Sequence, residues 1–163
     1  AQRFAIDHPK RTLGLVLIGA TATLKDKPGV KDLWDSISKL TDPIDPDFLR
    51  AFAQSTVFRS VPEAFFEAMV QESLKIPARV WRAAFEGLLA DDLSGERKII
   101  KAPTLIIWGD QDGICPRRDQ EALAAALEDS QLLVYAGTGH TPHWEEPERF
   151  ASDLVAFTEN LTS

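Results

Sequence analysis

Two residues that could share acid–base chemistry lie directly after apolar stretches of the chain. Asp112 follows the stretch 104–108, and His140 follows the stretch 131–135. Each stretch has the length and apolarity of a buried strand, and the carboxyl ends of parallel strands meet at one edge of a sheet. An imidazole is a general base near neutral pH, and an aspartate that accepts from its Nδ1–H fixes its tautomer. The pattern predicts two members of a Ser-His-Asp triad.

The acid has a rival, because the turn Gly109-Asp110-Gln111-Asp112 offers two carboxylates. Asp112 is the favoured partner of His140, since one crossover helix and one strand separate the two and both then emerge from adjacent strands. A carboxylate that only caps the turn is the simpler interpretation of either aspartate. The simpler interpretation of His140 is likewise a histidine in a surface loop that has no catalytic role.

Two other kinds of site are weaker. Cys115 could be a thiol nucleophile, but a small, partly buried side chain is the favoured interpretation. His8, His140 and His143 could suggest a metal site, but the sequence has no His-x-x-x-His and no cysteine pair. We therefore expect neither a metal nor a cofactor.

The nucleophile of the triad does not occur in the expected context. A nucleophilic serine of this chemistry sits in G-x-S-x-G, and no serine here has glycine two residues before and two residues after it. The first residues already have a helical pattern, so we expect that the chain begins within a structural element and that the serine lies outside it.

The order of elements around the two residues indicates an α/β fold. A strand, a helical insert, a strand, a helix, a strand and a helix predict a parallel sheet with right-handed crossovers. The expected elements are a helix at 1–8, strands at 13–19, 104–108 and 131–135, a helix at 118–127 and a helix from Pro147 onward. Glu145 and Glu146 precede Pro147, where negative charge suits a helix N-terminus, and we interpret them as structural.

Residues 30–97 have the pattern of successive helices. Apolar side chains at helical spacing predict one helix at 30–40 and others from Pro46 and Glu63, with Asp45 as a cap. Pro77 is expected in the first turn of a fourth helix. The many aromatic residues here are interpreted mainly as core.

Composition excludes several classes of protein. The chain of 163 residues has 44% hydrophobic residues and a formal net charge of −7, which argues against a nucleic-acid binder. No apolar run approaches the length of a membrane span. The single cysteine suits a reducing compartment, and we expect a cytoplasmic protein.

The chain resembles the C-terminal two-thirds of an α/β-hydrolase of the esterase, lactonase and haloperoxidase-like group. The likeness rests on residues 3–11, 13–19, 102–112, 137–140 and 144–150. The resemblance implies a partial α/β-hydrolase with three parallel strands, strands six to eight of the family sheet. It implies a hydrolase core at 1–27 and 98–163 and a helical cap at 28–97.

The resemblance also implies a function. The complete protein would hydrolyse small carboxylic esters or lactones, with Asp112 and His140 as catalytic residues and the serine supplied from outside this chain. The alternative is an inactive or self-associating fragment, and a dehalogenase relative with an aspartate nucleophile is a further option. We expect the strand edge at 13–18 to pair with the absent N-terminal portion or with a second copy.

Overall fold

The computed structural model describes residues 1–25, 27 and 29–161. Position 28, the expected first residue of the cap, lies outside the described residues. The chain divides into two compact units. A core unit contains residues 1–22, 56–60 and 93–163, and a helical unit contains residues 23–55 and 61–92.

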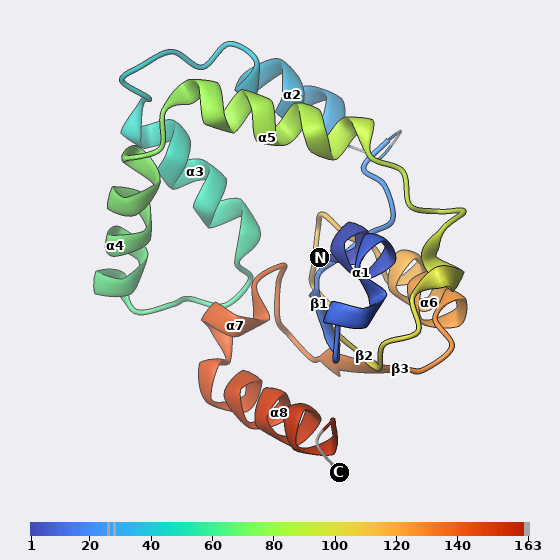
Figure 1. Ribbon diagram of the computed structural model, residues 1–163. Helices are drawn as coiled ribbons and strands as arrows, with labels where there is room; N and C mark the ends of the chain where they lie inside the picture. The colour runs from blue at the N-terminus through green and yellow to red at the C-terminus, as the bar shows by residue number, and fades with distance from the viewer. Residues whose placement is uncertain (26, 28, 162–163) are drawn as a thin grey trace. The chain divides into compact units, whose positions relative to one another are not determined.

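The core unit is built on a parallel sheet of three strands in the order β1-β2-β3 (Figure 1). The strands are β1 (Leu15–Ile18), β2 (Thr104–Gly109) and β3 (Ser130–Tyr135). The central strand β2 is buried along its whole length, as expected for a strand flanked on both edges and covered on both faces. The predicted α/β fold with three parallel strands is confirmed.

Helices cover the two faces of this sheet. On one face, α1 (Gln2–Asp7) and α6 (Arg117–Ala126) contribute Ala5 and Leu123 to a cluster with Leu17 and Ile106 of the sheet. On the other face, α8 (Pro147–Asn160) packs Phe150 and Phe157 against a cluster built from Leu105, Ile107 and Tyr135. Figure 1 shows α8 on the opposite side of the strands from α1 and α6. Alternate residues of β2 therefore point into two separate apolar clusters.

Prolines set several helix boundaries in the core unit. His8 leaves the helical conformation before Pro9, which ends α1 at Asp7 and opens the short 3-10 helix η1 (Pro9–Arg11). Pro116 precedes α6, which begins one residue earlier than predicted, and α8 begins at Pro147 as predicted. A second 3-10 helix, η2 (Arg97–Ile99), precedes β2, and α7 (Pro142–Glu145) precedes α8.

The helical residues form α2 (Val30–Ile37), α3 (Pro46–Thr56), α4 (Glu63–Leu74) and α5 (Ala78–Ala90). Asp45 caps α3 as predicted, because its Oδ1 accepts from the backbone N–H of Asp47 at 2.9 Å. The prediction for Pro77 was wrong: Pro77 has extended backbone angles and is the N-cap residue before α5. One buried apolar cluster of this unit contains Ile44, Leu49, Phe66, Val70 and Ala78.

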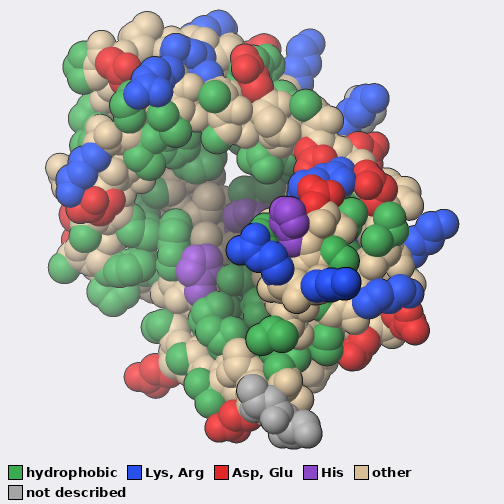
Figure 2. Space-filling model, in the orientation of Figure 1, with side chains coloured by type: hydrophobic (Ala, Val, Ile, Leu, Met, Phe, Trp, Pro, Cys, Tyr) green, Lys and Arg blue, Asp and Glu red, His purple; other side chains and the backbone are tan. Residues whose placement is uncertain are grey.

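Two surface properties bear on possible partners. Lys and Arg side chains occur together with Asp and Glu across the face drawn in Figure 2. A nucleic-acid backbone is instead bound by a surface on which Lys and Arg dominate. Among the described residues, no helix has both the length and the apolarity needed to cross a membrane.

Candidate active site

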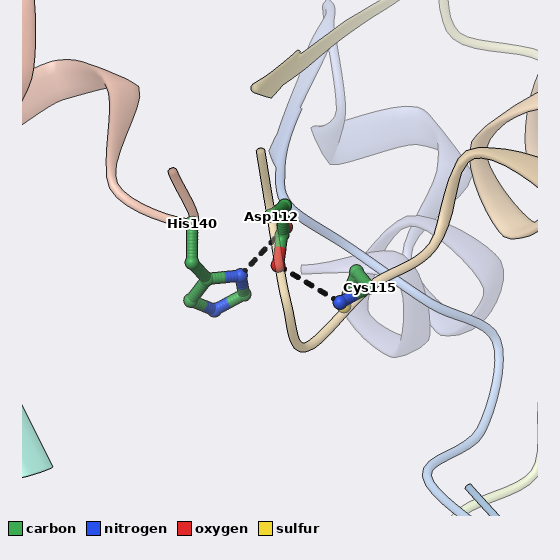
Figure 3. Close-up of side chains that lie close together, drawn as sticks. All are labelled: Asp112, Cys115 and His140. Carbon is green, nitrogen blue, oxygen red and sulfur yellow. Dashed lines mark hydrogen bonds and ion pairs between the residues drawn. The ribbon is translucent and has the colours of Figure 1, made fainter. Parts of the chain in front are cut away.

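The structure brings the predicted acid and base together at the carboxyl edge of the sheet. Asp112 follows β2 and His140 follows β3, and these strands pair in parallel up to Gly109 and Tyr135. His140 Nδ1 lies 2.9 Å from Asp112 Oδ2, and Figure 3 shows the imidazole turned toward the carboxylate. The two residues therefore have the geometry of a hydrogen-bonded acid–base pair.

Asp112 is held by the turn in which it lies. Its Oδ1 accepts from the backbone N–H groups of Ile114 at 2.8 Å and Cys115 at 2.9 Å. This leaves Oδ2 for the imidazole, whose Nδ1 then carries the proton and whose Nε2 carries a free lone pair. The carboxylate side chain is 0% exposed, whereas the side chain of His140 is 26% exposed. A reacting group can thus reach the imidazole, while the carboxylate stays shielded from water.

Asp110, the rival acid, has a different task. Its Oδ1 accepts from the backbone N–H of Gly137 at 2.6 Å and from the side chain of Gln111 at 3.1 Å. The hydrogen bond from Gln111, followed by that from Gly137, holds the pKa of Asp110 below its ordinary value. Asp110 therefore fixes the start of the loop that carries His140, whose imidazole is bonded to Asp112 instead.

Gly19, directly after β1, packs closely against the imidazole of His140. Its φ is +49°, and a Cβ atom added to it would lie 2.7 Å from His140 Nδ1 and 3.1 Å from Asp112 Oδ2. Only glycine fits both the positive φ and this close approach. From the sequence, Gly19 is predicted only as the last residue of the strand at 13–19. Its position after a strand adjacent to β2 was the available signal.

Residues 56–60, which lie within the predicted cap range 28–97, form a second support. The carbonyl oxygen of Thr56 accepts from the backbone N–H of His140 at 2.9 Å. The Arg59 guanidinium donates to the carbonyl oxygens of Gly137 at 2.7 Å and Ala136 at 2.8 Å. This segment, which joins α3 to α4 in the chain, thus holds both ends of the loop that presents His140.

Glu145 and Glu146 do not have only the helix-terminal role predicted for them. The carboxylate of Glu145 accepts from backbone N–H groups on residues 58, 59 and 139. That of Glu146 accepts from the hydroxyl of Thr138 at 2.8 Å and lies 3.1 Å from the guanidinium of Arg59. Both carboxylates therefore belong to the support of the His140 loop, which local sequence patterns could not reveal.

His143, three residues after the base, is a packed ring. Its ring centroid lies 5.3 Å from that of Trp144 and 5.7 Å from that of Phe150. Its Nδ1 is buried and has no hydrogen-bond partner within the described part of the chain. Burial, followed by the charge of His140, holds the pKa of His143 below its ordinary value. The environment therefore favours a neutral imidazole.

One set of side chains places potential metal-binding atoms close together. The ligand atoms of Asp112, Cys115 and His140 all lie within 4.8 Å of one another. Both Asp112 oxygens already accept hydrogen bonds, so an ion bound there would compete with the contact between Asp112 and His140. The side chain of Cys115 is buried, and its backbone carbonyl accepts from the Trp108 indole at 2.7 Å. The arrangement suits proton transfer better than metal coordination.

Comparison with known proteins places these features in a family. The family model described as alpha/beta hydrolase fold matches residues 1–147. The chain is 25% identical to the pimeloyl-[acyl-carrier protein] methyl ester esterase of Citrobacter koseri, over 99% of this chain and 66% of that protein. It is 26% identical to the protein of the same name from Edwardsiella ictaluri, over 98% of this chain and 65% of that protein. The chain thus spans just under two thirds of the length of these relatives.

Solved structures give the same result for the fold. An esterase from Exiguobacterium antarcticum has a TM-score of 0.84 and 22% identity, covering 99% of this chain and 62% of that one. A thermophilic esterase from Thermogutta terrifontis has a TM-score of 0.81 and 24% identity, covering 99% of this chain and 61% of that one.

Proposed function

This chain belongs to the alpha/beta hydrolase fold family, and on that premise we propose that Asp112 and His140 are the acid and base of a triad that hydrolyses carboxylic esters. The observation that carries the proposal is the 2.9 Å contact between His140 Nδ1 and Asp112 Oδ2. The contact orients the imidazole and leaves its Nε2 as the proton acceptor.

The chemistry follows from this tautomer. His140 Nε2 takes the proton of a serine hydroxyl while the serine oxygen forms a bond with the ester carbonyl carbon. The resulting imidazolium is stabilised by Asp112 and returns the proton to the leaving alcohol, which breaks the ester bond. A water molecule then attacks the acyl-enzyme by the same proton transfers, and the serine is released.

The nucleophile of this reaction comes from outside the chain, since no serine here lies in G-x-S-x-G. We propose that the chain by itself has no meaningful turnover, because both the nucleophile and the donors that stabilise the oxyanion are then lacking. The substrate class is small carboxylic esters or lactones. The relatives named as methyl ester esterases support the ester class.

We assign the helical residues 23–55 and 61–92 the role of a cap that selects the substrate. Exposed apolar side chains of this unit, such as Phe65, Val80 and Leu88, support this proposal, because they offer apolar surface for an acyl or alcohol group. Exchanging this unit for that of an esterase with another chain-length preference should change the ratio of kcat/KM values between short and long esters. An unchanged ratio would contradict the role.

The edge strand β1 provides a second proposal, on assembly. In the described part of the chain β1 pairs with β2 along one edge, so its other row of N–H and C=O groups is available for pairing. We propose that a strand from the remaining third of the protein pairs there, as the coverage of the relatives supports. Co-expression of that portion with this chain should give a stable 1:1 complex. A dimer of this chain alone that persists in the presence of the other portion would contradict it.

The proposed activity is tested on the complete polypeptide that carries this chain, with p-nitrophenyl acetate as substrate. His140→Ala should lower kcat by about 10³-fold or more, as removal of a triad member does, whereas the exposed His8 serves as the matched control in His8→Ala. Comparable turnover in the two variants would refute the role of His140. Turnover by this chain alone that His140→Ala abolishes would refute the need for an external nucleophile.

A further inference from the structure

Glu145, the last residue of α7, connects two segments that lie far apart in the sequence. Its Oε1 accepts from the backbone N–H of Gly139 at 2.9 Å. Its Oε2 accepts from the backbone N–H groups of Phe58 at 3.1 Å and Arg59 at 2.6 Å, 86 residues away in the case of Arg59. One carboxylate therefore satisfies three backbone donors with both of its oxygens.

These donors flank the proposed base. Gly139 immediately precedes His140, and the backbone N–H of His140 donates to Thr56 at 2.9 Å. A Cβ atom added to Gly139 would lie 2.7 Å from the nitrogen of Phe58 and 2.9 Å from the oxygen of Thr56, so the two backbones touch here. Any change in the position of residues 56–59 is therefore transmitted directly to the peptide that carries the imidazole.

Arg59 ties the same two segments together at a second point. Its guanidinium donates to the carbonyl oxygens of Gly137 and Ala136 and lies 3.1 Å from a carboxylate oxygen of Glu146. Glu145 accepts hydrogen bonds from backbone N–H groups, and Arg59 donates hydrogen bonds to backbone C=O groups. Together the two side chains satisfy both kinds of backbone group where the segments meet. The carboxylate of Glu145 acts nearest to His140, because its partner is the adjacent residue.

We infer that Glu145 is a positioning residue for His140, whose carboxylate sets the place of the imidazole by fixing Gly139 against the segment of residues 56–59. The inference rests on the proposed function for its effect on turnover, and on the geometry alone for its effect on the loop. It gives the inter-helix segment a role in the active site, although that segment contributes no side chain to the acid–base pair.

The chemistry of the side chain makes the inference testable by an isosteric change. In Glu145→Gln, the amide has one acceptor oxygen and one NH₂ group, which is a donor only. The amide NH₂ must then face backbone N–H groups, either that of Gly139 or those of Phe58 and Arg59, and two donors cannot form a hydrogen bond. The shape of the side chain is kept. However, the hydrogen bonds on one side of the Glu145 clamp, which joins Gly139 to Phe58 and Arg59, are lost. Glu148→Gln is the matched control, because Glu148 is exposed in the first turn of α8 and loses the same charge.

The experiment uses the complete polypeptide and reads the loop in two ways. We expect amide hydrogen exchange at Gly139 and His140 to become about tenfold faster or more in Glu145→Gln, reflecting easier local opening. The proton on His140 Nδ1 should also lose its downfield NMR resonance. The kcat for p-nitrophenyl acetate should fall by about 10²-fold, as expected for a displaced catalytic group, with a much smaller change in KM. Glu148→Gln should match the wild type in all of these measurements.

Exchange rates and an Nδ1 resonance in Glu145→Gln equal to those of Glu148→Gln would overturn the inference. If Glu145→Gln does not fold, exchange in the wild type decides: protection at Phe58, Arg59 and Gly139 supports the clamp, and free exchange at all three refutes it. The proposed function fails separately, when His140→Ala retains wild-type turnover. In that case the exchange measurements still test the clamp.

Discussion

Replacing Gly19 by alanine tests the geometry of the site at its tightest point. The new Cβ would lie 2.7 Å from His140 Nδ1 and 2.9 Å from Cε1, whereas ordinary contacts begin at 3.4 Å. The imidazole must therefore move away. The same Cβ would lie 3.1 Å from Asp112 Oδ2, so the carboxylate cannot move with the imidazole to keep the hydrogen bond between Asp112 and His140. With His140 as the proposed base, a displacement of this size should cost about 10²-fold in rate.

Alanine at this position also carries a backbone cost. The φ of +49° is left-handed, and an L side chain there is disfavoured by about 1–2 kcal/mol. Two matched glycines separate this strain from the clash. Gly29 has a φ of +76° with nothing within 4 Å of an added Cβ, and Gly95 has open space without a positive φ. Gly29→Ala therefore measures strain alone, and Gly95→Ala measures neither effect.

The assay combines thermal unfolding with ester hydrolysis by the complete polypeptide. Gly29→Ala should lose stability by about 1–2 kcal/mol and keep its kcat, while Gly95→Ala should change neither. Gly19→Ala should lose at least as much stability and, in addition, about 10²-fold in kcat. A Gly19→Ala variant with the kcat of Gly29→Ala would refute the close packing of the imidazole on this backbone.

Four further predictions concern neighbouring groups. Asp112→Asn should lower kcat by about 10³–10⁴-fold, because its NH₂ would donate to Nδ1 and select the wrong tautomer. Asp110→Asn keeps an acceptor for its backbone donor and should stay within about tenfold of the wild type in the same ester assay. His143 has a lowered pKa, so its contribution to stability is present above its unfolded pKa of about 6.5 and is lost as the pH falls below that value. His143→Phe should therefore flatten the fall in urea midpoint between about pH 7.5 and 5.5, and an unchanged slope would contradict this. Tyr135→Phe removes the hydrogen bond that the buried phenol donates to Asp153 at 2.5 Å, and urea unfolding should show a loss of about 1 kcal/mol.

The contact between Asp112 and His140 could be predicted because its geometry follows from local rules. Apolar stretches of strand length predicted β2 and β3, and parallel strands that end together bring the residues after them to one edge. The sequence favoured Asp112 over Asp110 through its place relative to the two strands, and the structure places Asp112 against the imidazole. Two carboxylates in one turn differ only in the direction each side chain takes, which depends on the N–H groups that the turn presents.

The supports of His140 could not be predicted, because their partners are distant in sequence. Glu145 directly precedes Glu146 and Pro147, and negative charge near a helix N-terminus is sufficient to explain such a pattern. Its N–H donors at 58 and 59 lie in a stretch that the sequence shows only as a break between two helices. A single sequence gives no sign that the residues between these two helices belong to the core unit, as residues 56–60 do.

The acid and the base are thus held by different kinds of constraint. Asp112 takes its position from N–H groups two and three residues further along the chain, so its orientation is fixed once its own turn forms. His140 depends on Thr56, on Gly19 and, through Gly139, on Glu145. An exchange of helical residues 23–55 and 61–92 should therefore preserve the acid–base geometry only if residues 56–60 are retained. An exchange that replaces them as well should leave Asp112 in place and release the imidazole, which the Nδ1 proton resonance would detect.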